Sequence, residues 1–157
     1  MKGGKTVLKE IIDNKRYSFR QNCNNWKEAV RFSCIPLIED DVITEEYAEK
    51  IIESITKYGP YIIITQDVAI PHSALGQDGV KKCGIGFMKV EEPVYFIEGN
   101  TEKRAKIFFT LAANNPDEHL KKMEELTNIL INDEILEKIK NVKNIDELKK
   151  ISEEYNV

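Results

Sequence analysis

The chain has 157 residues, of which 41% are hydrophobic and 32% charged, and its formal net charge is -4. This length is enough for one globular domain with a sizeable core. A mean hydropathy of -0.42 and the lack of an apolar run of membrane-spanning length exclude an integral membrane protein. The mild acidity argues against a dedicated nucleic-acid binder, which would carry a basic face.

The cysteines and the first residues indicate the cellular compartment. Cys23, Cys34 and Cys83 are odd in number and show no CxxC spacing, so neither a disulfide framework nor a structural zinc site is indicated. Cys34 and Cys83 fall in apolar patterns and are predicted to be small core residues. Residues 1–5 are basic, but the apolar stretch of a secretory signal does not follow them. We therefore expect a cytoplasmic protein with no metal or cofactor.

The first part of the chain predicts helices around one strand. A short amphipathic helix covers residues 6–12, and residues 17–21 alternate like a strand. Asn24 or Asn25 can cap the next helix, and Glu28 falls at the capping-box position if Asn25 is the cap. Pro36 is expected to kink that helix or to end it early, because proline lacks the N–H that an interior position needs.

A second helix and two extended pieces follow. Thr44 is predicted to cap a helix of clean 3.6-residue periodicity, which Gly59-Pro60 ends. The β-branched run at 61–65 predicts a strand buried on both faces. Residues 68–70 predict a very short extended piece, and 73–80 a flexible loop.

The rest of the chain completes an α/β pattern. Asn115-Pro116-Asp117-Glu118 opens a helix with an Asn cap, a proline in the first turn and two acids. The apolar stripe of that helix includes Leu120. The remaining predicted elements are strands at 83–90, 94–97 and 105–112, a turn at 91–93, and helices at 133–140 and 145–155. We predict one α/β domain spanning 1–157, with a small mixed sheet flanked by helices on both faces.

His72 is the first candidate for chemistry. It follows a short extended segment and Pro71, at the start of a glycine-containing loop. Proline restricts the residue before it to extended geometry, so the imidazole is held in a defined direction next to flexible backbone. That arrangement suits a nucleophile or a ligand, although a lone histidine is more often a residue satisfied at a turn.

His119 is the second candidate, and the chain contains no further histidine. It lies in the first turn of the helix that Asn115 opens, where unpaired backbone N–H groups and the helix dipole favour an anion such as phosphate. Asp117 and Glu118 put negative charge in the same turn and oppose an anion unless they point away, so spacing alone favours a solvated polar residue beside the cap. Trp26 and Tyr47 fall on apolar stripes and are predicted to be core residues.

Two segments carry a resemblance to a known family. Gly59-Pro60-Tyr61-Ile62-Ile63-Ile64, followed by Val68-Ala69-Ile70-Pro71-His72, resembles the enzyme IIA components of the bacterial sugar phosphotransferase system (PTS), in the mannitol/fructose class. Within that class, Gly59-Pro60-Tyr61 and Gly79-Val80-Lys81-Lys82 are similar to the ascorbate-type branch. The resemblance covers nearly the whole chain, and it implies the type-2 EIIA fold.

The resemblance also implies an activity. It makes His72 the residue that accepts a phosphoryl group from the phosphocarrier HPr and passes it to a IIB component, which serves the membrane component IIC. His119 matches a second histidine that supports the transfer. The protein is then a phosphotransferase and phosphohistidine carrier in sugar uptake, with no nucleic-acid partner and no insertion into the membrane.

The sequence departs from this family at three places. Residues 53–57 lack the arginine that many mannitol-class members carry there. Gln66-Asp67 stands where the ascorbate branch often has Pro-Gly. Pro36 interrupts a helix that is usually continuous. Stabilisation of a phosphoryl group by a guanidinium is therefore not carried over to this chain.

The partner surface and two alternatives complete the sequence-based interpretation. Ile70, Ala74, Leu75 and Val80 are candidates for an apolar patch that meets HPr and IIB in turn. One alternative is a regulatory protein of the nitrogen-PTS type, which signals through its phosphorylation state. The other is a non-catalytic module, or one whose two histidines bind a metal; two histidines without a paired carboxylate or thiolate make a poor site.

Overall fold

The computed structural model describes residues 6–157, so the expectation about a signal at residues 1–5 lies outside the described residues. Among 6–157, no helix is both long enough and apolar enough to span a bilayer. The elements found in residues 6–157 are α1 (Val7–Asp13), β1 (Tyr17–Arg20), α2 (Trp26–Glu39), α3 (Glu45–Tyr58), β2 (Ile63–Thr65), β3 (Asp67–Ala69), β4 (Gly84–Tyr95), β5 (Arg104–Ala112), α4 (Pro116–Leu130), α5 (Asp133–Lys140) and α6 (Ile145–Tyr155).

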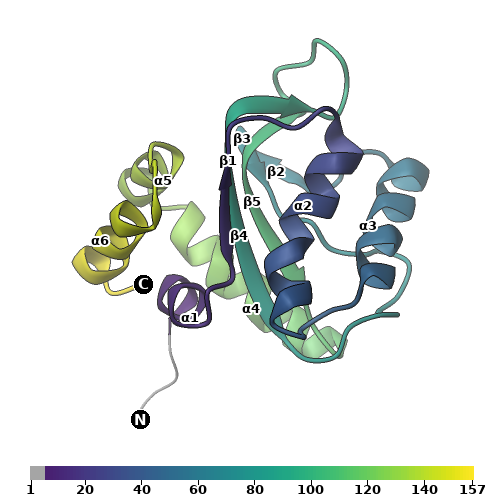
Figure 1. Ribbon diagram of the computed structural model, residues 1–157, viewed down its shortest axis with the longest axis horizontal. Helices are drawn as coiled ribbons and strands as arrows, with labels where there is room; N and C mark the ends of the chain where they lie inside the picture. The colour runs from purple at the N-terminus through teal and green to yellow at the C-terminus, as the bar shows by residue number, and fades with distance from the viewer. Residues whose placement is uncertain (1–5) are drawn as a thin grey trace.

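The strands form one mixed sheet in the order β1-β4-β5-β3-β2. The pairs β1–β4 and β3–β5 are parallel, and β4–β5 and β2–β3 are antiparallel. Figure 1 shows α2 and α3 against one face, and α1, α4, α5 and α6 on the other side. The predicted mixed sheet with helices on both faces is therefore confirmed.

The two central strands divide the core into two clusters. Successive side chains of a strand point to opposite faces of its sheet. Phe87 and Phe109 accordingly pack with α1, α4, α5 and α6, whereas Met88 and Phe108 pack with α2 and α3. All four side chains are fully buried. Burial of a side chain of this size stabilises the fold by about 1.5–3 kcal/mol, so both helical layers are held on β4 and β5.

The strand predicted at 61–65 is shorter and more exposed than expected. β2 begins only at Ile63, pairs with β3 alone and forms an edge of the sheet. Ile64 is 44% exposed. The prediction of burial on both faces was wrong, because a β-branched run does not by itself distinguish a central strand from an edge strand.

The strands predicted on either side of residues 91–93 are one continuous strand, β4. The β4–β5 register shifts between Lys89 and Val94, which accommodates Pro93 where the ladder is interrupted. The predicted turn was therefore wrong. Cys83 lies just before β4 and is only half-buried, whereas Cys34 is buried as predicted.

The helices begin at the predicted cap residues, but one cap makes no hydrogen bond and one helix is longer than predicted. The side chains of Asn25 and Asn115 accept backbone hydrogen bonds from Glu28 and Glu118, each at 2.9 Å. Thr44 occupies the cap position of α3, but its hydroxyl makes no capping bond. α2 runs through Pro36 to Glu39, so early termination was wrong: Pro36 itself is buried, and packing on the sheet outweighs the lost hydrogen bond.

A buried lysine fastens the C-terminal helices to the sheet. Lys89 on β4 is 1% exposed, and its Nζ donates to Glu91 and to the Val142 carbonyl, each at 2.8 Å. Val142 lies between α5 and α6. Hydrogen bonds from Lys143 and Lys89 lower the pKa of Glu91 to about 2, so the carboxylate stays charged across the physiological range.

We predict that Lys89→Ala lowers the free energy of unfolding by about 3 kcal/mol, because it leaves the buried Val142 carbonyl without its donor and removes the buried one of the two lysines that pair with Glu91. Urea unfolding measures the change. Lys143→Ala is the matched control: it removes the exposed partner of the same carboxylate, Glu91, and leaves stability nearly unchanged. Equal destabilisation by the two variants would contradict a structural role for the buried amine.

Candidate active site: a histidine pair at the end of two parallel strands

The two histidines predicted as site residues lie side by side. Their ring centroids are 5.2 Å apart and the rings are tilted by 57°. The topology explains the meeting: β3 and β5 are parallel neighbours, so their C-terminal ends share one edge of the sheet. His72 follows β3 after Pro71, and α4, which carries His119, follows β5. The Leu111 amide donates to the Pro71 carbonyl at 2.9 Å and ties these two strand ends together.

The His72 ring is fixed by a hydrogen bond to its own segment. Its Nδ1 lies 2.6 Å from the Ile70 carbonyl oxygen. A carbonyl only accepts, so Nδ1 carries the proton and donates it. Burial lowers the pKa of His72 below its ordinary value, and repulsion from His119 lowers it further, against the opposing effect of the Ile70 carbonyl. The ring is therefore neutral at neutral pH, and Nε2 holds the lone pair.

Hydroxyl groups from α3 and the segment after it hold the backbone around His72. The Tyr61 hydroxyl donates to the His72 carbonyl, and the Tyr61 ring meets the imidazole edge-on at 5.1 Å between centroids. The Ala74 amide donates to Ser54 Oγ at 3.0 Å, and the Ser73 amide to the Tyr47 hydroxyl at 3.3 Å. Sequence reasoning assigned Tyr47 only to the core, where it does lie, and gave neither Ser54 nor Tyr61 a role at the site.

Most backbone donors in the first turn of α4 are already used. The N–H of Glu118 is taken by the Asn115 cap, the N–H of His119 donates to the Asn115 carbonyl at 3.0 Å, and Pro116 has no N–H. The Glu118 carboxylate accepts from Asn115 Nδ2 at 3.0 Å. The helix end therefore has few backbone donors left for an anion. The group that this turn adds to the site is the His119 imidazole. Desolvation lowers the pKa of His119.

The described residues 6–157 give the pair neither a bonded cation nor a metal-binding cluster. Within residues 6–157, no lysine or arginine forms an ion pair or hydrogen bond with either imidazole. Lys50, one turn before Ser54 on α3, instead pairs with Asp78 at 3.9 Å. In the same described range, no cluster of three histidine, cysteine or carboxylate side chains is arranged to hold a metal.

The predicted partner surface needs one correction and one addition. Ile70 is fully buried, so its place in an apolar contact patch was wrong. Ala74 is exposed, and Leu75 and Val80 are half-buried. Leu120, which was predicted to face the core, is 59% exposed and directly follows His119. It is an exposed apolar side chain adjacent in sequence to the histidine pair.

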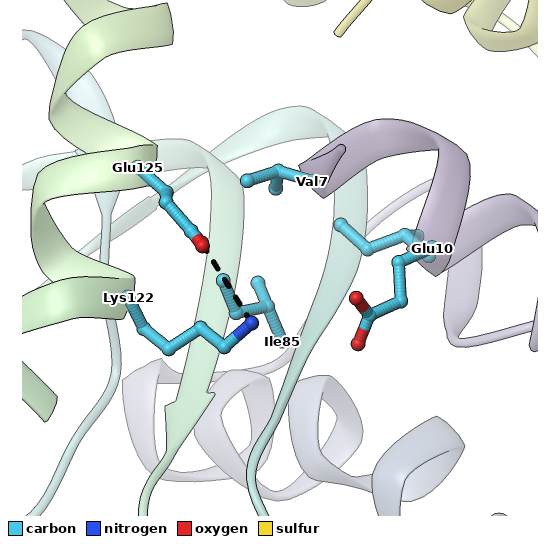
Figure 2. Close-up of a pocket in the computed structure, with 6 residues that line it drawn as sticks. Val7, Glu10, Ile85, Lys122 and Glu125 are labelled. Carbon is cyan, nitrogen blue, oxygen red and sulfur yellow. Dashed lines mark ion pairs between the residues drawn. The ribbon is translucent and has the colours of Figure 1, made fainter. Parts of the chain in front are cut away.

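An enclosed cavity elsewhere in the fold is too small for a substrate. It measures about 10 Å³, and Figure 2 shows the Lys122–Glu125 ion pair, 3.7 Å long, at its edge. That space suits about one water molecule. Neither histidine lines the cavity, whose walls come from Val7, Glu10, Ile11, Ile85, Lys122 and Glu125. The two histidines are half-buried and lie outside this cavity.

The family relationship is established by comparison with known proteins. Residues 10–155 match the family model of the phosphoenolpyruvate-dependent sugar phosphotransferase system, EIIA 2. The mannitol-specific cryptic phosphotransferase enzyme IIA component of Escherichia coli (strain K12) is 33% identical over 132 residues, which is 84% of this chain and 88% of that protein. The ascorbate-specific PTS system EIIA component of the same strain is 28% identical over 109 residues, covering 69% and 70%.

Solved structures agree. The solution structure of the cryptic mannitol IIA component from Escherichia coli has 30% identity and a TM-score of 0.80, covering 93% of this chain and 97% of that one. The Escherichia coli mannitol IIA protein in complex with phosphorylated IIB has 22% identity and a TM-score of 0.74, covering 87% and 93%, a likeness of fold. This chain belongs to the PTS EIIA type-2 family, whose members are phosphotransferase components of sugar uptake.

The position of His72 predicts its titration. Because burial and His119 both disfavour the imidazolium, we expect an NMR titration midpoint below 6.5. The unfolded chain then binds the proton first, so this group lowers stability as pH falls from 6.5 towards the folded-state pKa. His119→Gln removes the repulsion and shifts the midpoint upward. A midpoint at or above 6.5 in the unsubstituted protein would contradict the account.

Proposed function

We propose that this protein carries a phosphoryl group on His72 between phospho-HPr and a IIB component, with His119 supporting the transfer. The observation that carries the proposal is the bond from Nδ1 to the Ile70 carbonyl, which leaves the Nε2 lone pair on a neutral ring. A neutral imidazole with a directed lone pair is the form that attacks phosphorus. The family membership supplies the reaction class.

The proposed step is an in-line displacement at phosphorus. The Nε2 lone pair of His72 forms the new N–P bond while the N–P bond of phospho-HPr breaks, and that bonding pair returns to the HPr imidazole. In phosphorylated His72, Nδ1 keeps its proton and still donates it to the Ile70 carbonyl. In the onward step a nucleophile of IIB, a cysteine in the ascorbate-type branch, takes the phosphoryl group and the electron pair returns to Nε2.

His119 is proposed to stabilise the charge on the moving phosphoryl group. Its ring lies close enough to that of His72 for an N–H to meet an equatorial phosphoryl oxygen. The family arginine is missing at 53–57. Without that guanidinium, His119 has to provide more of the charge stabilisation than a histidine that shares the site with an arginine.

Transport is preferred to regulation as the role of the carrier. The relatives described above are named as mannitol-specific and ascorbate-specific components, and these names favour a sugar permease over a signalling target. Both sugars appear among the relatives, so we assign the choice of sugar to the IIB and IIC partners. Exchange with HPr and IIB would take place in the cytoplasm.

A phosphorylation assay tests the two histidines. With phosphoenolpyruvate, enzyme I and HPr, we expect the protein to be labelled by radioactive phosphoryl and His72→Ala to lose the label, because only Nε2 of His72 is prepared to attack. His119→Ala should keep the label and slow transfer to IIB by about a hundredfold, the scale of one lost electrostatic stabiliser. Full labelling of the His72 variant would show that the carrier was assigned wrongly.

The exposed leucine beside His119 predicts a docking effect. Leu120→Asp should raise the KM for phospho-HPr about tenfold with kcat little changed, because it places charge in an apolar contact. Ile131→Asp is the matched control, an apolar-to-acid change at a 70% exposed position that follows the other end of α4. If both variants raise KM equally, net charge and not docking explains the effect.

A further inference from the structure

The backbone around His72 is held at three successive residues by hydroxyl groups. We define the His72 segment as residues 70–74. The His72 carbonyl accepts from Tyr61, the Ser73 amide donates to Tyr47, and the Ala74 amide donates to Ser54. β3 ends at Ala69, and backbone hydrogen bonds still hold the first two residues of the segment, Ile70 and Pro71. From His72 to Ala74, the bonds that hold the backbone come from side-chain hydroxyls.

Ser54 is fully used by this arrangement. It is fully buried on α3, donates to the Lys50 carbonyl at 2.8 Å and accepts from the Ala74 amide at 3.0 Å. Its donor capacity goes to its own helix and its acceptor capacity to the His72 segment. Because α3 packs on the sheet through its apolar stripe, its position is fixed, and the hydrogen bond from Ala74 to Ser54 holds the His72 segment against it.

Tyr61 contacts both the backbone and the ring of His72. Its hydroxyl donates to the His72 carbonyl, and its ring lies edge-on to the imidazole at an interplanar angle of 83°. Burial raises the pKa of Tyr61, so the hydroxyl keeps the proton that it donates. The contact limits rotation of the imidazole from one side, while Pro71 restricts the backbone from the other.

The consequence concerns which nitrogen reacts. Nδ1 reaches the Ile70 carbonyl only while the His72 segment keeps its present turn. In free imidazole the two neutral tautomers are close in energy, so the bond made by one nitrogen decides the state of the other. Resting on the proposed carrier role of His72, we propose that Tyr61 and Ser54 are positioning residues that hold the Nδ1–H tautomer and thereby select Nε2 as the phosphorylated atom.

The spacing of the hydroxyl residues is a sequence signal for this role. Tyr47, Ser54 and Tyr61 are seven residues apart, and the first two lie on the same face of α3, two turns apart. Thr56 on the same helix makes the same kind of bond to its own backbone, to Ile52 at 2.9 Å. Among residues 6–157, Thr56 makes no bond to the His72 segment. A Thr56 variant therefore loses only the bond within the helix, whereas a Ser54 variant also loses the bond to the His72 segment.

The test is the tautomer of His72 in the unphosphorylated protein, read from ¹⁵N chemical shifts of the imidazole. We expect the unsubstituted protein to show one tautomer, protonated on Nδ1. Tyr61→Phe/Ser54→Ala should show both tautomers. Tyr58→Phe/Thr56→Ala, which likewise removes one tyrosine hydroxyl and one helical hydroxyl but away from the segment, should show one. If the double variant does not fold, Tyr61→Phe alone carries the test, because it keeps the ring.

Phosphorylated samples supply the second measurement. In the Tyr61→Phe/Ser54→Ala variant, ³¹P NMR should show phosphoryl on both ring nitrogens, with kcat about tenfold lower and the KM for phospho-HPr unchanged. A single tautomer and a single phosphorylated nitrogen in that variant would overturn the positioning role and leave the carrier role intact. Absence of any phosphoryl on the unsubstituted protein would instead overturn the carrier role, while the tautomer measurement would still be readable.

Discussion

The hydrogen bond from Nδ1 of His72 to the Ile70 carbonyl is the contact on which the site depends. It ties the ring to the backbone two residues earlier, so the direction of the imidazole is set by the path of the chain after β3. It also assigns the single proton of the neutral ring, and with it the position of the lone pair. The hydroxyls of Tyr47, Ser54 and Tyr61 hold the backbone that makes this bond possible.

The sheet topology explains why such a site exists at this edge. β3 and β5 run in parallel, so the two chain segments that leave the sheet at their ends start side by side. One segment carries His72 directly, and the other enters α4, whose first turn carries His119. The cores on the two faces of β4 and β5 hold these strands in place, so the histidine pair lies at the end of a strand, β5, that is buried between two cores.

Much of the fold followed from local patterns. The two C-terminal helices, the asparagine caps of α2 and α4 and the covering of both sheet faces were predicted because periodicity and capping are local properties. Pro36, the edge strand β2 and the continuity of β4 were not, since each depends on packing partners far away in the sequence. Leu120 was assigned to the core for the same reason: its spacing fits the apolar stripe, but nothing packs over it there.

The site was predicted in its parts but not in its geometry. The extended segment, Pro71 and the first turn of α4 singled out His72 and His119, and the family resemblance joined them. The tautomer could not be predicted, because the Ile70 carbonyl is a backbone group that no sequence motif specifies. Ser54 and Tyr61 were not recognised either: a buried serine on a helix and a tyrosine before a strand are ordinary until their hydroxyls are placed against the His72 segment.

The most direct test of the carrier assignment is peptide mapping by mass spectrometry of the protein phosphorylated through HPr, kept at alkaline pH to preserve phosphohistidine. The chain has only two histidines, and they fall on separate peptides, so the result is unambiguous. The account predicts one phosphoryl group, on the peptide that contains His72. Phosphoryl on the peptide that contains His119, or on neither peptide, would contradict it.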